Sequence, residues 1–146
     1  MMPAPPKTTD LTVTRMISAH PQDVYDVWLD PSSPGGPWHG AAKAIVNATV
    51  DGLFYHAMEF EGRNWPHYGR FTRLERGRTI EHTWMSPATQ GLETIVNLTL
   101  VAKGNQTEVT LRHSGVPDDE MGRMHQEGWT WILSALDESL AKKQAV

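Results

Sequence analysis

The chain has 146 residues, of which 39% are hydrophobic and 21% charged, and its formal net charge is −4. This length suits one domain with a sizeable core, and the composition is typical of an ordinary globular protein. The negative net charge gives no indication of a basic surface that would bind nucleic acid. The chain has no cysteine, which excludes disulfides, thiolate metal sites and a cysteine nucleophile.

The start of the chain is rich in proline and holds no apolar signal-peptide core. We expect residues 1–9 to be a disordered leader, residues 10–146 to form the domain, and the protein to be cytoplasmic. No apolar run approaches the ~20 residues that a membrane helix needs, so membrane insertion is not expected.

The first elements are a strand and a short helix. Residues 11–17 alternate in polarity, which predicts a strand. Pro21 suits the first turn of a helix, and Val24, Val27 and Trp28 follow at the spacing of an amphipathic helix. Prolines and glycines between residues 31 and 37 end this helix, with room for a second helical turn before residue 40.

A series of strands comes next. The alternating segments are residues 43–50, 53–60, 67–75, 79–85, 92–102 and 107–113. Short turn signals separate them, of which Asp51-Gly52 is the clearest, so we expect antiparallel hairpins. One face of the second segment holds Phe54, His56, Met58 and Phe60.

The pattern changes to a helical period after Pro117. Asp118, Asp119 and Glu120 suit the positive end of a helix, and lysines near residue 142 suit its negative end. About 24 residues would span roughly 36 Å, enough to cross a small domain. One stripe of this helix holds Met121, His125, Trp129, Ile132, Leu133, Leu136 and Leu140.

Together these elements predict an α+β helix-grip fold. A curved antiparallel sheet of about six to seven strands would wrap around a long C-terminal helix, with one or two short helices after the first strand. Such a sheet leaves a hollow beside the helix, which is a natural site for a small molecule.

Three stretches carry a resemblance to the START/birch-pollen-allergen superfamily, also called SRPBCC. Residues 19–28 are similar to its entry into the first helix, and Asp51-Gly52-Leu53-Phe54 is similar to its Gly-Gly-x-aromatic hairpin. Residues 111–117, continued by Gly128-Trp129, look like its last strand, turn and G-W-x-x-x-L-x-x-L helix. The branch it resembles most is the C-terminal domain of the activator of the ninety-kilodalton heat-shock protein ATPase, over residues 11–141.

That resemblance implies the helix-grip fold without selecting one function. Members of the superfamily include lipid and polyketide binders, cyclases, hydroxylation components and co-chaperone domains, and fold alone does not choose among them. The chain also departs from the pattern, because Trp38-His39-Gly40 stands where many relatives show Trp-Trp-Gly-Pro.

Histidines are the candidates for chemistry. The sequence has no His-x-His or His-Glu-x-x-His pattern, so we predict no metal site and no cofactor. His56, His82 and His113 lie on separate predicted strands and are the candidate catalytic residues, as general acids or bases in a shared pocket. Glu59 and Glu81 alternate onto the opposite faces, which weakens this idea.

Aromatic and methionine side chains suggest the pocket itself. Trp38, Trp65 and Tyr68 fall near loops, where an aromatic residue often marks a pocket rim, and residues 64–68 are the best candidate for a portal. The alternative is that Trp65 only packs over a loop. Met124 would add adaptable lining. The predicted ligand-binding residues are Phe54, His56, Met58, Phe60, Trp65, Tyr68, His82, Trp84, His113, Met121, His125 and Trp129.

Three functions follow from these features. The leading hypothesis is a non-enzymatic protein that binds a small hydrophobic, aromatic or lipid-like molecule between the sheet and the last helix. The alternatives are an enzyme with cyclase-, isomerase- or hydrolase-like acid–base chemistry on a polyketide-like or aromatic carbonyl substrate, and a co-chaperone-like interaction module. A homodimer is compatible with the sequence, which specifies no surface for it.

Overall fold

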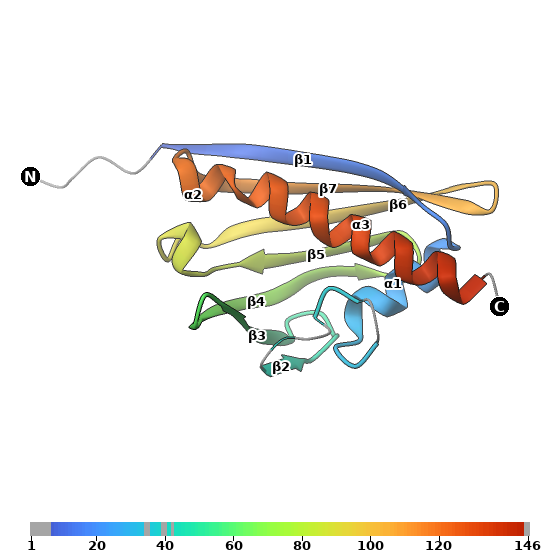
Figure 1. Cartoon of the computed structure of the whole chain (residues 1–146), viewed down its shortest axis with the longest axis horizontal. Helices are drawn as coiled ribbons and strands as arrows, with labels where there is room; N and C mark the ends of the chain where they lie inside the picture. The colour runs from blue at the N-terminus through green and yellow to red at the C-terminus, as the bar shows by residue number, and fades with distance from the viewer. Residues whose placement is uncertain (1–6, 34–35, 39–40, 42, 145–146) are drawn as a thin grey trace, which may run out of the picture.

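The structure, a computed structural model, describes residues 7–33, 36–38, 41 and 43–144 (Figure 1). The strands are β1 (Thr8–Ile17), β2 (Lys43–Val46), β3 (Leu53–Phe60), β4 (Arg63–Glu75), β5 (Thr79–Trp84), β6 (Thr94–Lys103) and β7 (Gln106–Pro117). The helices are α1 (Pro21–Leu29), the short 3₁₀ helix η1 (Pro87–Thr89), α2 (Glu120–Arg123) and α3 (His125–Gln144).

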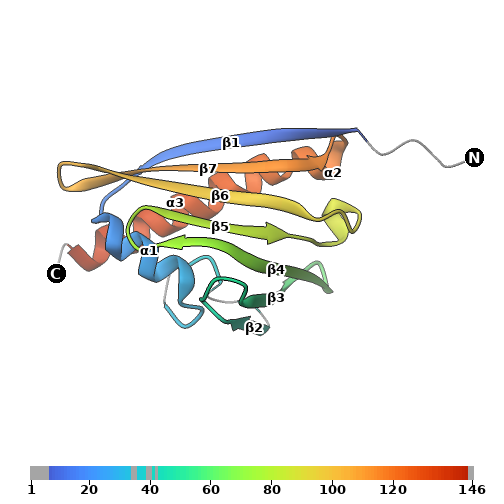
Figure 2. The ribbon, with the colours of Figure 1, turned by 180° about the vertical axis from the view of Figure 1, so that it is seen from behind.

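The strands form one antiparallel sheet in the order β1-β7-β6-β5-β4-β3-β2. Helix α3 runs diagonally across one face of this sheet (Figure 1), and the view from behind shows the strands in front of it (Figure 2). The α+β helix-grip prediction is therefore confirmed. Within the described ranges, no helix is both long enough and apolar enough to cross a membrane.

Several predicted boundaries differ from the structure. Strand β4 begins at Arg63 rather than at residue 67, because Glu61 and Gly62 take the positive φ values of a tight turn, 52° and 73°. Strand β7 continues to Pro117, which pairs with Thr8, so β1 starts inside the segment expected to be a disordered leader. The remainder of that leader, residues 1–6, lies outside the described residues.

The region between α1 and β2 also differs. The described residues 31–33, 36–38 and 41 form turns instead of a second helix, held for example by the Gly36 amide donating to the Ser33 carbonyl at 3.0 Å. The other residues of that expected helical turn, including His39 and Gly40, lie outside the described part of the chain.

The C-terminal helix is interrupted once. Asp119 caps α2 by accepting a hydrogen bond from the Gly122 amide at 2.7 Å, and Met124 then separates α2 from α3. A side chain at position 122 would not fit, because a Cβ there would lie 1.8 Å from the Pro117 carbonyl oxygen. The predicted long helix is confirmed, with a break at its first turn.

The core lies under the C-terminal half of α3. Leu133, Leu136 and Leu140 are buried against the sheet, and each buried leucine contributes about 1.5–3 kcal/mol. Asp137 fixes the helix to the end of β1, because its carboxylate accepts hydrogen bonds from the Arg15 guanidinium at 3.1 Å and from the Ser18 amide at 2.9 Å. This half of α3 is structural, and the half before Leu133 is the part that faces a cavity.

Candidate functional site

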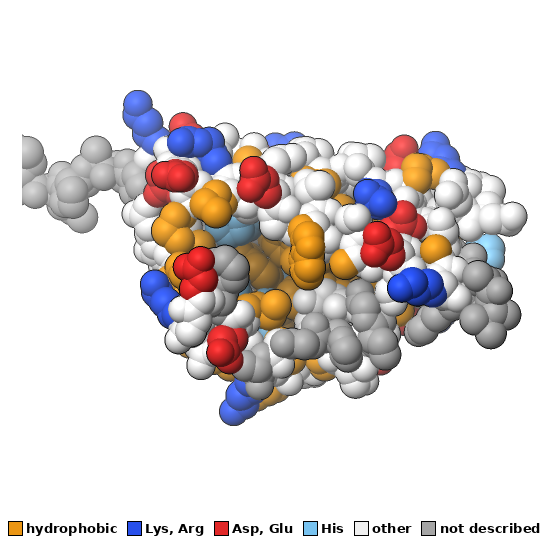
Figure 3. All heavy atoms as spheres, in the orientation of Figure 1, with side chains coloured by type: hydrophobic (Ala, Val, Ile, Leu, Met, Phe, Trp, Pro, Cys, Tyr) orange, Lys and Arg blue, Asp and Glu red, His pale blue; other side chains and the backbone are white. Residues whose placement is uncertain are grey.

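A cavity of about 380 Å³ lies between the N-terminal half of α3 and strands β3, β4 and β5. It opens to the surface as a hollow floored by histidine and hydrophobic atoms (Figure 3). The described residues that line it are Pro37, Trp38, His56, Met58, Trp65, His67, Trp84, Ala88, Met121, Met124, His125, Gly128, Trp129 and Ile132.

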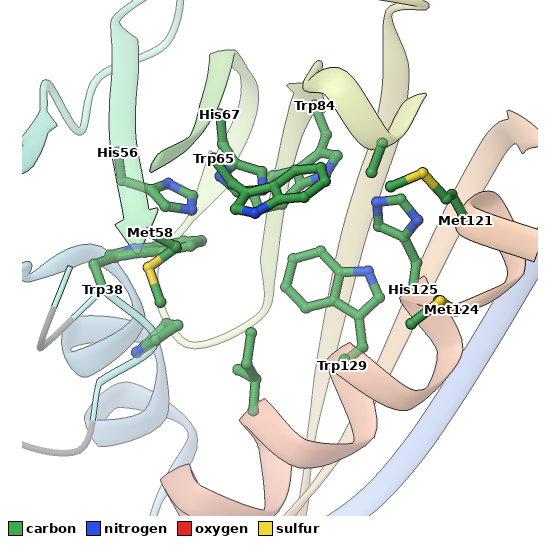
Figure 4. Close-up of a pocket in the computed structure, with 14 residues that line it drawn as sticks. Trp38, His56, Met58, Trp65, His67, Trp84, Met121, Met124, His125 and Trp129 are labelled. Atoms are coloured by element: carbon green, nitrogen blue, oxygen red, sulfur yellow. The ribbon is translucent and has the colours of Figure 1, made fainter. Parts of the chain in front are cut away.

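The β3–β4 hairpin supplies one wall. Its register places His56 opposite His67 and Met58 opposite Trp65, and directly opposed residues point to the same face of a sheet. The two imidazole rings consequently stack, with centroids 4.5 Å apart and planes 10° apart. Figure 4 shows these side chains reaching the cavity from the strands, opposite His125 and Trp129 on the helix.

Four indoles enclose the space, and two of them have committed N–H groups. The Trp38 Nε1–H donates to the Trp28 carbonyl at 2.7 Å, which fixes the loop before β2 over the cavity. The Trp129 Nε1–H donates to His113 Nδ1 at 3.0 Å. The Trp84 Nε1, by contrast, is buried without a hydrogen-bond partner among the described residues.

A chain of hydrogen bonds stands behind the indole wall. Because an indole nitrogen can only donate, His113 Nδ1 accepts from Trp129, and His113 Nε2–H donates to Thr94 Oγ1 at 2.7 Å. The Thr94 hydroxyl then donates to the Trp84 carbonyl at 2.6 Å. We call this chain the Trp129–His113–Thr94 relay. It joins α3 to β5, β6 and β7.

Electrostatics keep His113 neutral in this arrangement. Burial, followed by the nearby rings of His125 and His82, lowers the pKa of His113 to about 2. A neutral ring is what the relay requires, because a protonated Nδ1 would face the Trp129 donor. His113 therefore positions two walls of the cavity from behind.

The two stacked histidines are also neutral. Burial lowers the pKa of His56 to about 3, with smaller contributions from His67 and His82. Burial lowers the pKa of His67 to about 4, with a smaller contribution from His125. The Nδ1 atoms of both rings are buried and have no hydrogen-bond partner in the described part of the chain.

His125 presents an acceptor to the cavity. Its Nδ1 lies 2.9 Å from the Gly122 carbonyl oxygen, which can only accept, so the proton is on Nδ1. Burial is the main cause that lowers the pKa of this ring. In the neutral ring the remaining nitrogen, Nε2, carries a lone pair.

The structure brings together most of the predicted ligand-binding set. The members that line the cavity are His56, Met58, Trp65, Trp84, Met121, His125 and Trp129. Met121 is exposed and Trp65 is half-buried, and the Arg63 guanidinium lies 4.1 Å from the centre of the Trp65 ring. The portal over residues 64–68 stays a prediction.

Other members of the set lie elsewhere. Phe54 and His82 pack on each other in the core, with ring centroids 4.8 Å apart, and His82 Nδ1–H donates to the Thr83 carbonyl at 2.9 Å. Tyr68 is half exposed beside Tyr55, 5.0 Å away between ring centroids. His113 lies in the relay, and the side chain of Phe60 is outside what the structure describes.

This geometry gives little support to the hypotheses of a catalytic or a metal site. Of His56, His82 and His113, only His56 lines the cavity, and no carboxylate stands among the described lining residues. Glu81 accepts hydrogen bonds from Thr72 at 2.8 Å and Asn97 at 3.0 Å, away from the cavity. Within the described ranges, no three histidine or acidic side chains are grouped so that they could hold a metal ion.

Some lining residues stand outside the predicted ligand set: Pro37, His67, Ala88, Gly128 and Ile132, together with Trp38 and Met124, which the sequence suggests only as a rim and a lining residue. A signal existed for His67, because it shares a face with Phe71 on the strand that the sequence predicts over residues 67–75, and Phe71 is buried. Gly128 follows Met124 and His125 at helical spacing. Trp38 reaches the cavity through tertiary packing of a loop, for which the sequence has no periodic signal.

Comparisons with known proteins agree with this fold. The family model described as "Activator of Hsp90 ATPase homolog 1-like protein" matches residues 18–141. No curated protein matches the chain.

Solved structures give the same architecture at low identity. The Mll3558 protein from Rhizobium loti has a TM-score of 0.80 at 17% identity, covering 93% of this chain and 99% of its own. An Hsp90 activator from Plasmodium falciparum has a TM-score of 0.74 at 20% identity, over 90% of this chain and 96% of its own. The Aha1 dimer from Colwellia psychrerythraea has a TM-score of 0.70 at 18% identity, with coverages of 90% and 96%. These likenesses establish the fold alone.

Proposed function

This chain belongs to the activator of Hsp90 ATPase homolog 1-like family, and we propose that it binds a small, largely apolar aromatic molecule beside α3. The observation that carries the proposal is the cavity of about 380 Å³ walled by four indoles and three methionines. Its volume lies in the range of about 300–1,000 Å³ that is usual for small-molecule sites. Indole rings favour flat aromatic partners, and methionine side chains adapt to their shape.

Binding without catalysis is favoured over the enzymatic alternative. His56 is the one candidate base that lines the cavity, and its pKa of about 3 makes it a weak base at neutral pH. No carboxylate in the described lining could orient that ring or raise its pKa. The co-chaperone alternative is supported by the description of the family and by the name of a protein with 20% identity, and the homodimer by the name of a protein with 18% identity. The cavity, by contrast, is an observation on this chain itself.

The test uses Gly128, which lines the cavity at the end of the first turn of α3. A Cβ added at this position would meet no atom within 4 Å, so Gly128→Leu would project into open space. Leucine also favours the helix by roughly 0.8–1 kcal/mol over glycine, so the variant should fold. Thr130→Leu is the matched control, because Thr130 is exposed on the same helix and does not line the cavity.

The probe is N-phenyl-1-naphthylamine, an uncharged fluorophore whose emission rises in apolar surroundings. We expect the unchanged protein and Thr130→Leu to bind it equally, and Gly128→Leu to bind at least about tenfold more weakly, a loss of roughly 1.4 kcal/mol. Absence of binding by the unchanged protein, or equal binding by all three proteins, would contradict the proposal.

A further inference from the structure

We infer that Met121 and Met124, two exposed residues of the cavity lining, form a reversible oxidation site whose modification by a peroxide releases the ligand. The inference rests on the proposed function and adds to it a control of ligand binding by oxidation. It depends on the exposure of the two side chains, on their place in the lining and on the hydrogen bonds around them.

Exposure separates these two residues from the other methionines. Met121 and Met124 are 44% and 55% exposed, which are the largest values among the five methionines that the structure describes. Both line the cavity, and Figure 4 shows them on the helix side of it, beside His125. Because a peroxide must approach the sulfur from solvent, these two thioethers should react before those of half-buried Met58 and Met85. The chain has no cysteine that would compete for the oxidant.

The reaction adds one oxygen atom to each sulfur. A lone pair of the thioether attacks one peroxide oxygen, the O–O bond breaks, and the S–O bond forms. The sulfur loses two electrons, and hydrogen peroxide is reduced to water. A methionine sulfoxide reductase reverses the step, because two thiols return the electrons, become a disulfide and release the oxygen as water.

The sulfoxide changes the polarity of the helix wall. Its oxygen is a strong hydrogen-bond acceptor, which water can satisfy while the cavity is empty. An apolar ligand would displace that water, and two N–H groups of this wall are already committed. His125 donates to the Gly122 carbonyl at 2.9 Å, and Trp129 donates to His113 at 3.0 Å. The dehydrated sulfoxide should therefore weaken the binding of an apolar aromatic molecule at least about fivefold.

The fold should tolerate this modification. Both side chains are exposed, so the sulfoxide oxygen stays hydrated in the free protein. The turn between them is held through its backbone, because the Asp119 carboxylate accepts a hydrogen bond from the Gly122 amide at 2.7 Å. A loss of affinity without a change in the thermal unfolding midpoint would therefore place the effect at the site.

The experiment uses the full chain and dilute hydrogen peroxide. Catalase removes the remaining peroxide, and the protein is then titrated with N-phenyl-1-naphthylamine. Peptide mass spectrometry follows the gain of oxygen at each methionine. We expect Met121 and Met124 to be oxidised faster than Met58 and Met85, and the affinity to fall at least about fivefold at an unchanged thermal midpoint. A methionine sulfoxide reductase supplied with a thiol should restore the affinity.

Two variants assign the effect to these sulfurs. The double variant Met121→Leu/Met124→Leu keeps apolar side chains, so peroxide should leave its affinity at its own starting value. Met16→Leu is the matched control, because Met16 is 38% exposed on β1 and does not line the cavity. This control should lose affinity on oxidation as the unchanged protein does.

The outcomes separate this inference from the proposed function. Faster oxidation of Met58 and Met85, an unchanged affinity once both sulfoxides are present, or an equal loss in the double variant would overturn the inference and leave the cavity a binding site. Recovery of the affinity with the reductase tests the inference on the unchanged protein even if the double variant does not fold. Failure of the untreated protein to bind the probe would overturn the proposed function, and the inference with it.

Discussion

Replacing His113 tests the reasoning about the wall of the cavity. In His113→Phe a ring of similar size remains, but the Trp129 Nε1–H loses its acceptor inside a side chain that is only 2% exposed. Thr94 keeps its bond to the Trp84 carbonyl, so one buried donor is left unsatisfied. An unsatisfied buried polar group costs about 1–3 kcal/mol. We expect the free energy of unfolding to fall by about that amount in urea titrations followed by circular dichroism.

The matched control and a second variant locate the effect. His20→Phe makes the same exchange at an exposed histidine with no side-chain capping bond, and should change stability by no more than about 0.5 kcal/mol. Thr94→Val leaves both the His113 Nε2–H and the Trp84 carbonyl without this partner, so its cost should equal or exceed that of His113→Phe. If His113→Phe is as stable as the unchanged protein, the relay does not contribute as we describe.

Three further predictions concern the strands and the helix. Gly69→Ala should lower the free energy of unfolding by about 1–3 kcal/mol in urea, because its Cβ would lie 2.1 Å from Phe54 Cε1 and 2.2 Å from the Thr83 carbonyl oxygen; unchanged stability would contradict the packing. In the folded chain the pKa values of His56, His67 and His82 are lowered to about 3, 4 and 4. In the unfolded chain these rings bind protons below about pH 6.5. The free energy of unfolding should therefore fall as the pH falls toward about 4. The free energy of unfolding should change by up to about 1.4 kcal/mol per pH unit for each ring. Urea midpoints measured between pH 7.5 and 5.0 give this slope, and a midpoint that does not change with pH would refute the prediction. Asp137→Asn should cost about 1 kcal/mol by thermal or urea melting, since it weakens the contacts of α3 with Arg15 and Ser18, and an unaltered midpoint would count against them.

The fold was predictable because its signals are local and repeated. Alternation located every strand of the sheet, and the helical stripe from Trp129 to Leu140 located the helix that the sheet grips. The errors fall at the ends of strands, where the conformation of a single residue sets the boundary. Glu61 adopts a positive φ, which a sequence pattern does not predict for glutamate, and the predicted start of β4 is therefore four residues too late.

The site was less predictable because a strand face shows only that a side chain points inward. His56, His82 and His113 all do so, yet His82 is packed under Phe54 and His113 is held by Trp129 and Thr94. Whether an inward residue meets a cavity or another side chain depends on residues from distant elements. The alternating pattern of one strand therefore identified the histidines as buried and could not rank them as ligand contacts.

Gly128 lies on the part of α3 that lines the cavity, before the part that packs on the core. Leu133, Leu136 and Leu140 fill the space under the later turns of α3, and each combines good helix propensity with buried apolar area. Gly128 provides neither, and a Cβ at this exposed position would meet no atom within 4 Å at the edge of the cavity. A helix that served only to close the core would be more stable with almost any larger apolar residue at this position. A larger side chain at position 128 therefore stabilises the helix while it is added at the edge of the cavity, and this is why Gly128→Leu is the sharpest perturbation of the proposed binding site.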